Sequence, residues 1–497
     1  MNLCGSDITY YNTIERKNIL DADLNSTRRK NKYGVLIAML LGSFSVLLNN
    51  SILNIAIPSF MQLFDINATQ AQNVVVGFMI PMMVAMTLSG YIADILTKKI
   101  VYIMGIVLFL CGSLLGTMAW NFPSLIMFRI IQGIGGGLVM PLSISILFNY
   151  FPKEERGFAT GIWGIAVMVA PAIGPTLGGL ILEFSSWKML FAMNIPTSII
   201  CIVATSYFMK EKRENKKIKF DTVGFICITV GIICLTLGIN RIPYGLNENS
   251  WLTITLILTG IISVALFIYT ELHIQIPLID LRIFKNSIFT NSTIIVAVCT
   301  ASLFSGAILL PLLLQDVLRM SALTSGVVLL PQGIMMGIAM TIGGKILDRN
   351  GVKVILPLGI LILSGVTFIL SMTIGHISLI LLIILLIVRG MGIGLINTPA
   401  TTAGLNALPE FQVSRALSMN NVIRQLIGAI SIILFSMFFE TRRIVYMEYM
   451  SEKDAGILSV QQSFLIMGIM ILLVIPFSLK MHYKNKTVTN TTLSKLG

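Results

Sequence analysis

The sequence predicts an all-α polytopic membrane protein with about fourteen transmembrane helices. Of its 497 residues, 55% are hydrophobic and only 11% are charged, and its mean hydropathy is +0.88. Soluble globular chains carry about a quarter charged residues. Apolar segments of roughly 20 residues recur from Gly34 to Lys480, and each is long enough to cross about 30 Å of hydrocarbon as a helix. These segments are continuously apolar, whereas the strands of a membrane β-barrel alternate between polar and apolar residues.

The distribution of positive charge predicts the orientation of these helices. The net charge is +13, and the two richest basic clusters lie at Arg16 to Lys32 and at Lys210 to Lys219. An even number of helices places both termini on one side, and most Lys and Arg residues then fall on that side. Because cytoplasmic loops carry the excess of positive charge, we expect both termini in the cytoplasm. The many Ile, Lys and Asn residues suggest an AT-rich bacterial genome. The charge favours contact with membrane lipids and gives no reason to expect a nucleic-acid partner, while a specific anionic-lipid role of the clusters stays open.

Residues that carry enzyme chemistry are scattered rather than clustered. The six cysteines have no metal-type spacing, and the three histidines lie at the ends of predicted helices. Gly344-Lys345 is followed by Ile346, so this segment is not a phosphate-binding loop. The sequence therefore predicts a protein that is not an enzyme and holds no cofactor or metal, and that is driven by an ion gradient or by the gradient of its substrate.

A weak internal repeat predicts two halves. Three pairs of landmark residues recur at similar offsets, namely Pro81 and Pro331, Asp94 and Asp348, and Arg129 and Arg389. Such a pattern is typical of an ancient duplication in a transporter. The predicted organisation is a cytoplasmic N-terminal tail (1–33), an N-terminal six-helix bundle (34–209), a basic linker with two inserted transmembrane helices (210–286), a C-terminal six-helix bundle (287–482) and a cytoplasmic C-terminal tail (483–497).

An arginine stands within the fourth predicted helix. Arg129 lies in an apolar span, where an uncompensated charge costs several kcal/mol. Gln132 follows at i+3 and shares its helix face. We expect Arg129 to be functional, with a purely structural hydrogen-bonding role as the alternative.

The turn after the second predicted helix places Asp94 close to Lys98 and Lys99. A carboxylate at a helix end that gains and loses a cationic partner acts as a charge-regulated latch. The pattern recurs at Asp348 and Arg349, which favours the latch over ordinary helix-end charges.

The fifth predicted helix is rich in proline and glycine. Pro171 and Pro175 remove backbone hydrogen bonds, while Gly174, Gly178 and Gly179 allow close helix contact. The pattern predicts a kinked, closely packed helix that gates a pathway, with packing alone as the alternative.

These motifs together resemble the major facilitator superfamily, and in particular its fourteen-helix drug:proton antiporter family of the EmrB/QacA type. The likeness includes the helix 2–3 turn, R-x-x-Q-G-x-G-G-G, G-P-x-x-G-G and SRALSMNNVIRQLIGA. It implies the major facilitator fold, with two six-helix bundles and two inserted helices that alternate access to a central cavity. It also implies export in exchange for protons, with Asp94 as the latch, Arg129 in proton coupling and Gly174, Pro175, Gly178 and Gly179 as the antiporter motif.

The chain departs from the family pattern where a proton would be carried. Asn49 stands where the family usually has an acid, and no Asp or Glu lies near the middle of any predicted helix. We therefore expect coupling to use Asp316 or Asp94, alone or together with Arg129, with a plain helix cap as the alternative role of Asp316. Without a buried acid, neutral or mixed amphiphiles should be handled at least as well as permanent cations.

The predicted function is secondary active export of hydrophobic or amphiphilic small molecules, such as drugs and antibiotics, across the cytoplasmic membrane. The alternatives are a dedicated exporter or facilitator of one endogenous metabolite, lipid or peptide, and a membrane sensor that transports nothing. By position and family analogy, the expected cavity contacts are Asn49, Asn54, Trp163, Asn397 and Asn420.

Overall fold

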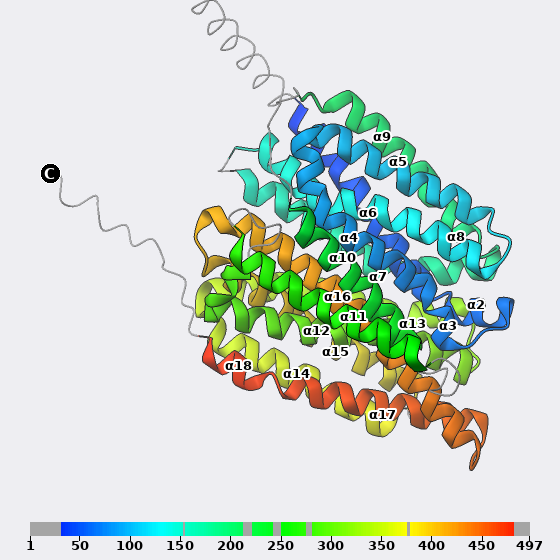
Figure 1. The fold of residues 1–497 in the computed structure, drawn as a ribbon. Helices are drawn as coiled ribbons and strands as arrows, with labels where there is room; N and C mark the ends of the chain where they lie inside the picture. The colour runs from blue at the N-terminus through cyan, green and yellow to red at the C-terminus, as the bar shows by residue number, and fades with distance from the viewer. Residues whose placement is uncertain are drawn as a thin grey trace, which may run out of the picture.

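The computed structural model describes residues 31–152, 155–211, 221–241, 250–274, 281–374 and 378–481. Long helices lie side by side in this part of the chain (Figure 1), as the sequence predicts. Among the described residues, 13 helices are long and apolar enough to cross a membrane. Helix α7 (Arg156–Phe184) has 29 residues and is a further long helix, although some of its side chains lie outside the description. These helices together match the predicted fourteen.

The N-terminal bundle begins with a helix over Asn31–Asn54. Two short helices, α2 (Ile57–Phe64) and α3 (Ala68–Ala71), follow it. The remaining helices of this bundle are α4 (Asn73–Ile95), α5 (Lys98–Thr117), α6 (Phe122–Tyr150), α7, the short α8 (Met189–Ala192) and α9 (Asn194–Phe208).

The inserted helices and the C-terminal bundle complete the chain. The inserted pair is α10 (Thr222–Arg241) and α11 (Ser250–His273), which pack mainly against each other and touch α4 and α16 along one side. A short 3-10 helix, η3 (Leu281–Lys285), precedes the C-terminal bundle. That bundle consists of α12 (Ser287–Pro311), η4 (Leu312–Val317), α13 (Ala322–Asn350), α14 (Val352–Thr373), α15 (Leu379–Asn406), α16 (Glu410–Met447), α17 (Glu452–Leu472) and α18 (Ile475–Lys480).

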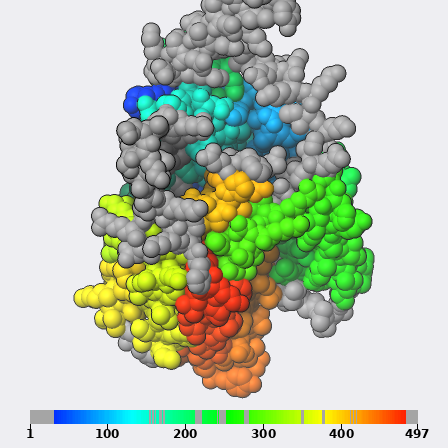
Figure 2. Space-filling view, turned by 90° about the vertical axis from the view of Figure 1, so that its left-hand side faces the viewer, coloured from blue at the N-terminus to red at the C-terminus, as the bar shows by residue number. Residues whose placement is uncertain are grey.

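The two ends of the long membrane helices form distinct faces of the molecule. We call the end at which the chain enters at Asn31 and leaves at Lys480 the terminal face, and the end that carries α2 and α3 the opposite face (Figure 1). Figure 2 views the terminal face, with the N-terminal bundle above the C-terminal bundle and the green inserted region to the right. The predicted tails lie outside the described residues, apart from residues 31–33.

Polar side chains cap the helices where they begin. Asn121 accepts a hydrogen bond from the Ser124 backbone N–H at 2.8 Å at the start of α6. Ser321, Ser378 and Ser451 cap α13, α15 and α17 in the same way. Since the first N–H groups of a helix have no partner within it, these caps set where each span begins.

The end of α12 departs from α-helical geometry. Pro311 lacks an N–H group, and the six residues that follow it form the π-helical turn η4. A π-turn inserts extra backbone and changes the direction of the side chains beyond it. The residues of η4 are buried, and they include Gln315 and Asp316.

Glycines bring α4, α5 and α6 into backbone contact. A Cβ atom at Gly133 would meet the backbone oxygen of Phe78, and one at Gly137 would meet the backbone oxygen of Met82. On α5, a Cβ atom at Gly112 would lie 2.7 Å from the backbone nitrogen of Gln132. Small residues at such contacts are the usual way for membrane helices to approach closely.

Replacing Gly133 by alanine should destabilise the N-terminal bundle, because the added methyl group meets backbone that has no side-chain freedom to move. We expect a cost of about 1–3 kcal/mol, seen as a drop of several degrees in the apparent Tm of the purified protein. Gly365→Ala on α14 is the matched control, since nothing lies within 4 Å of its added Cβ and alanine favours the helix. Equal Tm values for the two variants would contradict this packing.

Candidate functional site

Arg129 is completely buried in α6, and most of its guanidinium is satisfied locally. Its Nε donates to the backbone oxygen of Val74 at 2.9 Å, and its Nη1 donates to Gln132 Oε1 at 2.8 Å. The guanidinium also lies over the ring of Phe78, 4.2 Å from the ring centre. The negative face of an aromatic ring attracts a cation most strongly where water is excluded. The predicted pairing with Gln132 is therefore present.

A chain of amides extends from Arg129 across the N-terminal bundle. Gln132 Nε2 donates to Ser113 Oγ at 2.7 Å and lies 3.4 Å from Asn49 Oδ1. Asn194 Nδ2 donates to the same Asn49 oxygen at 2.9 Å. Asn49, expected from the sequence to contact the cavity, is instead fully buried in this network. It joins the first helix to α6 and α9.

Arg389 occupies the corresponding place in the C-terminal bundle, but with fewer partners. Its Nη2 donates to the backbone oxygen of Ser302 at 2.6 Å and to Ser302 Oγ at 3.2 Å. The side chain is completely buried, and its Nε and Nη1 have no hydrogen-bond partner. The aromatic ring of Phe464 lies 5.9 Å away. The guanidinium of Arg389 therefore has more N–H donors than there are hydrogen-bond acceptors within reach.

The glycine-rich segment of α7 packs against two helices at once. A Cβ atom at Gly174 would lie 2.5 Å from Ser51 Oγ, and one at Gly178 would lie 2.8 Å from the backbone oxygen of Ile52, both in the first helix. A Cβ atom at Gly179 would meet the backbone of Ala322, where α13 of the other bundle begins. The motif residues thus lie where the two bundles touch.

Hydrogen bonds join the two bundles near the opposite face. Thr176 Oγ1 in α7 donates to the backbone oxygen of Gly326 in α13 at 3.0 Å. Gln315 Nε2 in η4 donates to the backbone oxygen of Ile55 at 2.9 Å. Pro175 takes part through its backbone, because a Cβ atom at Gly326 would meet its carbonyl group.

A buried ion pair lies beside this contact. Asp316 Oδ2 is 2.7 Å from Arg443 Nη1, and Arg443 Nη2 is 2.5 Å from Glu452 Oε1. Arg319 lies 3.8 Å from Asp316 and 3.7 Å from Glu452. Glu440 lies one turn before Arg443 on α16, a helix that touches α3 of the other bundle. We call Asp316, Arg319, Glu440, Arg443 and Glu452 the ion cluster.

The turn at the terminal face has a different pattern of contacts. Asp94 is exposed at the end of α4 and forms no ion pair with any residue that the structure describes. Lys99 instead contacts α9 and the residues after it, where its Nζ donates to the backbone oxygens of Ser206 at 2.9 Å and Met209 at 2.6 Å. The side chains of Asp348 and Arg349 lie outside the described part of the chain.

The other expected cavity residues do not form one group. Trp163 is half-buried, and its Nε1 donates to Ser43 Oγ at 2.9 Å. Asn54, Asn397 and Asn420 are buried on three different helices, and the side-chain oxygens of Asn54 and Asn420 have no hydrogen-bond partner.

Sequence reasoning missed Arg424. This arginine lies within the candidate span Met419–Met447 of α16 and is half-buried. In the sequence, Arg424 stands as a single charge in the mostly apolar segment VIRQLIG, and this could have marked it as a candidate. Arg443 was missed as the partner of Asp316, because its position suggests an ordinary helix-end charge.

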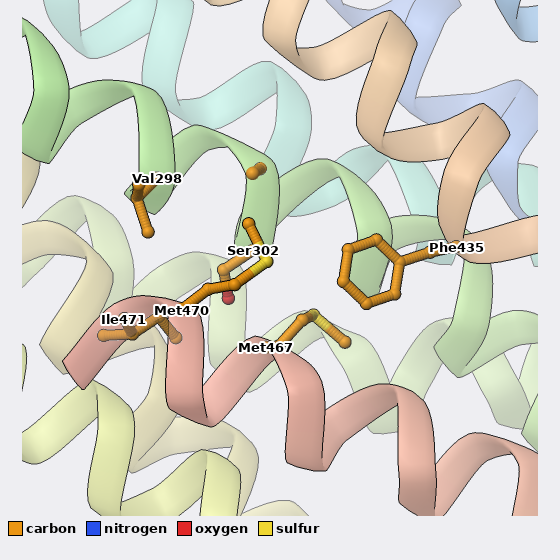
Figure 3. A pocket seen from close by; sticks show the side chains of 7 residues that line it. Val298, Ser302, Phe435, Met467, Met470 and Ile471 are labelled. Carbon is orange, nitrogen blue, oxygen red and sulfur yellow. The ribbon is translucent and has the colours of Figure 1, made fainter. Parts of the chain in front are cut away.

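Figure 3 shows a small hollow between α12, α16 and α17, which Ser302, Phe435 and Met467 help to line. Its lining side chains leave almost no free space inside it, whereas drug-sized ligands occupy pockets of about 300–1,000 Å³. We therefore do not assign it to a substrate. Among the described residues, no group of three or more His, Cys, Asp or Glu residues has the arrangement of a metal site.

Comparison with known proteins gives three bacterial relatives of similar length. The chain is 31% identical over 434 residues to the uncharacterized MFS-type transporter YhcA of Bacillus subtilis, covering 86% of this chain and 80% of that protein. It is 30% identical over 436 residues to the riboflavin transporter RibZ of Clostridioides difficile, covering 88% and 94%. It is 29% identical over 417 residues to the lincomycin resistance protein LmrB of Listeria innocua, covering 83% and 88%.

The fold and the family agree. A solved D-xylose-proton symporter superimposes with a TM-score of 0.65 at 14% identity, covering 91% of this chain and 98% of that one. At this identity the likeness concerns the fold. Residues 39–432 match the family model described as Major Facilitator Superfamily. The chain is therefore a multi-pass membrane transporter, not an enzyme, and it belongs to the Major Facilitator Superfamily.

Proposed function

We propose that this transporter exports hydrophobic or amphiphilic small molecules across the cytoplasmic membrane in exchange for protons, by alternating access between its two bundles. The observation that carries the proposal is the contact between the bundles. The hydrogen bonds from Thr176 and Gln315 both lie toward the opposite face. A carrier closed at one face offers its central site to the other.

The orientation follows from the distribution of charge. Lys32, Lys98, Lys99, Lys345 and Lys353 all stand where helices meet the terminal face. The positive-inside rule supports a cytoplasmic terminal face with both chain ends on that side. The closed opposite face then points outward, so that the protein is ready to take substrate from the cytoplasm.

The exposed Asp94 is consistent with this state. A latch between α4 and neighbouring charges would hold the terminal face closed, and it should be released when that face is open. In the described structure Asp94 has no ionic partner, while Lys99 contacts α9. We therefore assign the latch role to Asp94 in the outward-open state only.

The substrate class rests on the relatives and on the chemistry of the spans. One relative is named for lincomycin resistance and thus supports drug export. Another is named a riboflavin transporter, which supports a dedicated exporter or carrier of one metabolite as the second candidate. The number of chemically unrelated compounds that are moved distinguishes the two.

Proton coupling is assigned to the ion cluster rather than to the middle of the membrane. Asn49 replaces the usual acid, and the network around Arg129 contains amides and hydroxyls but no described carboxylate. Asp316 and Glu440 are the carboxylates nearest the contact between the bundles. Protonation of either one would weaken its attraction to Arg443 and loosen the outer closure.

The direct test uses inside-out membrane vesicles with an acidic interior and a fluorescent pH probe. A panel of unrelated amphiphiles should dequench the probe, since each compound that enters drives protons out. Arg129→Ala should abolish the signal, because it removes a buried charge and leaves the Val74 carbonyl and Gln132 without their donor. Lys188→Ala, at an exposed site, is the control.

The outcomes separate the alternatives. Dequenching by a single compound class would favour the dedicated exporter. Uptake of labelled compound without proton movement would exclude antiport, and a complete lack of uptake by any compound would count against export of amphiphiles.

Asp316→Asn should open the outer closure. Removing one partner of a buried ion pair costs about 3–5 kcal/mol, enough to shift a two-state equilibrium strongly. Spin labels at Met118 and Tyr449, which are exposed on different bundles near the opposite face, would report the change in a background without native cysteines. We expect a larger population of long distances in the variant.

Asp454→Asn provides the matched control for this experiment. Asp454 is an exposed carboxylate near the same face, and its side chain contacts Ser451 rather than the ion cluster. Identical distance distributions for Asp316→Asn and the parent protein would show that the ion pair does not hold the closure.

A further inference from the structure

The charge inside the C-terminal bundle is positive and incompletely matched. Two arginines, Arg389 on α15 and Arg424 on α16, lie within candidate membrane spans. Arg389 is completely buried and leaves Nε and Nη1 without partners. Arg129 in the other bundle has its Nε and Nη1 satisfied and leaves only Nη2 without a partner. A buried donor without an acceptor costs about 1–3 kcal/mol, and more when it is charged.

Arg424 adds a second guanidinium to the same region. It forms no hydrogen bond or ion pair with any described residue, and it is half-buried rather than enclosed. Arg389 is held against Ser302 on α12, whereas Arg424 has no described partner.

The position of Arg424 relates it to the boundary between the bundles. Gly428 lies one turn further along α16, and its added Cβ would lie 2.9 Å from Met79 Cε of the N-terminal bundle and 2.9 Å from Phe304. Residues four apart share a helix face, so Arg424 is on the face of α16 that meets this boundary. Met79 and Phe304 supply apolar surface next to the charge.

No carboxylate among the described residues forms an ion pair with Arg389 or Arg424. The described acidic residue of α16 that lies within its span, Glu440, belongs to the ion cluster four turns away toward the opposite face. The neighbouring amides of Asn420 and Gln425 have side-chain oxygens without partners, and amide oxygens do not neutralise a cation. The guanidinium donors therefore lack an anion.

Resting on the proposed function, we propose that Arg424 forms a subsite for the carboxylate group of an acidic amphiphilic substrate. A guanidinium presents its donors as a planar fork that matches the two oxygens of a carboxylate. In a site of low dielectric constant, this attraction is much stronger than in water. The apolar body of the substrate would lie toward Met79 and Phe304. The transporter would then prefer acidic over cationic amphiphiles.

The test measures binding to the full-length protein in nanodiscs of zwitterionic lipid. The probes are pyrenebutyrate and its uncharged analogue pyrenebutyramide, which share the aromatic body and differ at the acid. Arg424→Gln should weaken pyrenebutyrate binding at least about tenfold, equivalent to 1.4 kcal/mol, and should change pyrenebutyramide binding less than about twofold. Arg424→Lys should recover part of the preference for the acid, because it restores the charge without the fork.

The control is Arg442→Gln, a half-buried arginine on the same helix whose Nε donates to Gln462 Oε1 at 2.9 Å near the opposite face. It should leave the binding of both probes unchanged. Equal weakening of acid and amide by Arg424→Gln would overturn the inference, because it would indicate a role in packing. Unchanged binding of both probes would overturn it as well.

A second arm identifies the source of the anion. Nanodiscs that contain phosphatidylglycerol should not displace pyrenebutyrate, because the subsite faces the substrate path. If this lipid competes in the parent protein and not in Arg424→Gln, the arginine binds a lipid headgroup and the substrate subsite is excluded.

Transport of the two probes into vesicles tests export separately from binding at the subsite. Transport of pyrenebutyramide by both the parent and Arg424→Gln, without any preference for the acid, would leave export standing and remove the subsite. Charge-dependent binding in nanodiscs without transport of either probe would leave the subsite standing and count against export of these amphiphiles.

Discussion

The exclusion of water from the membrane interior is the constraint on which this structure depends. A charge there must find partners within the protein, and Arg129 finds them in a backbone carbonyl of α4, an amide of its own helix and the face of Phe78. Through Gln132 and Asn49 the same requirement connects the first helix, α5, α6 and α9. The N-terminal bundle is thus organised around one buried cation.

The contact between the bundles uses a different principle. Within a bundle, glycines permit backbone approach, and polar side chains are satisfied deep inside. Between the bundles, the described hydrogen bonds lie toward one face, where Gly179 also meets α13 and Gln315 meets the end of the first helix. Contacts concentrated at one end resist separation there while permitting rotation about that end. Rigid bundles with a localised contact are what alternating access requires.

The sequence predicted the helices and the family, because hydrophobic length and short motifs are local signals. It also singled out Arg129, since a charge in an apolar span is conspicuous, and it paired Arg129 correctly with Gln132. The surroundings of Asn49 were not predictable, because Ser113, Gln132 and Asn194 come from three other helices.

The partner of Asp316 was equally hidden, since Arg443 lies 127 positions away and at a helix end. Arg424 carried a visible signal that was not used. Side-chain partners depend on helix rotation, which a single sequence does not specify.

The π-helical turn that follows Pro311 places two closure elements on one short stretch of backbone. Gln315 reaches the other bundle, and its neighbour Asp316 holds Arg443. Conversion of this turn to α-helix would shift the register by one residue and rotate both side chains by about 100°. The hydrogen bond of Gln315 and the ion pair of Asp316 with Arg443 would then be lost together. In the proposed transport cycle, a change of winding in this one turn of α12 would engage or release both contacts together.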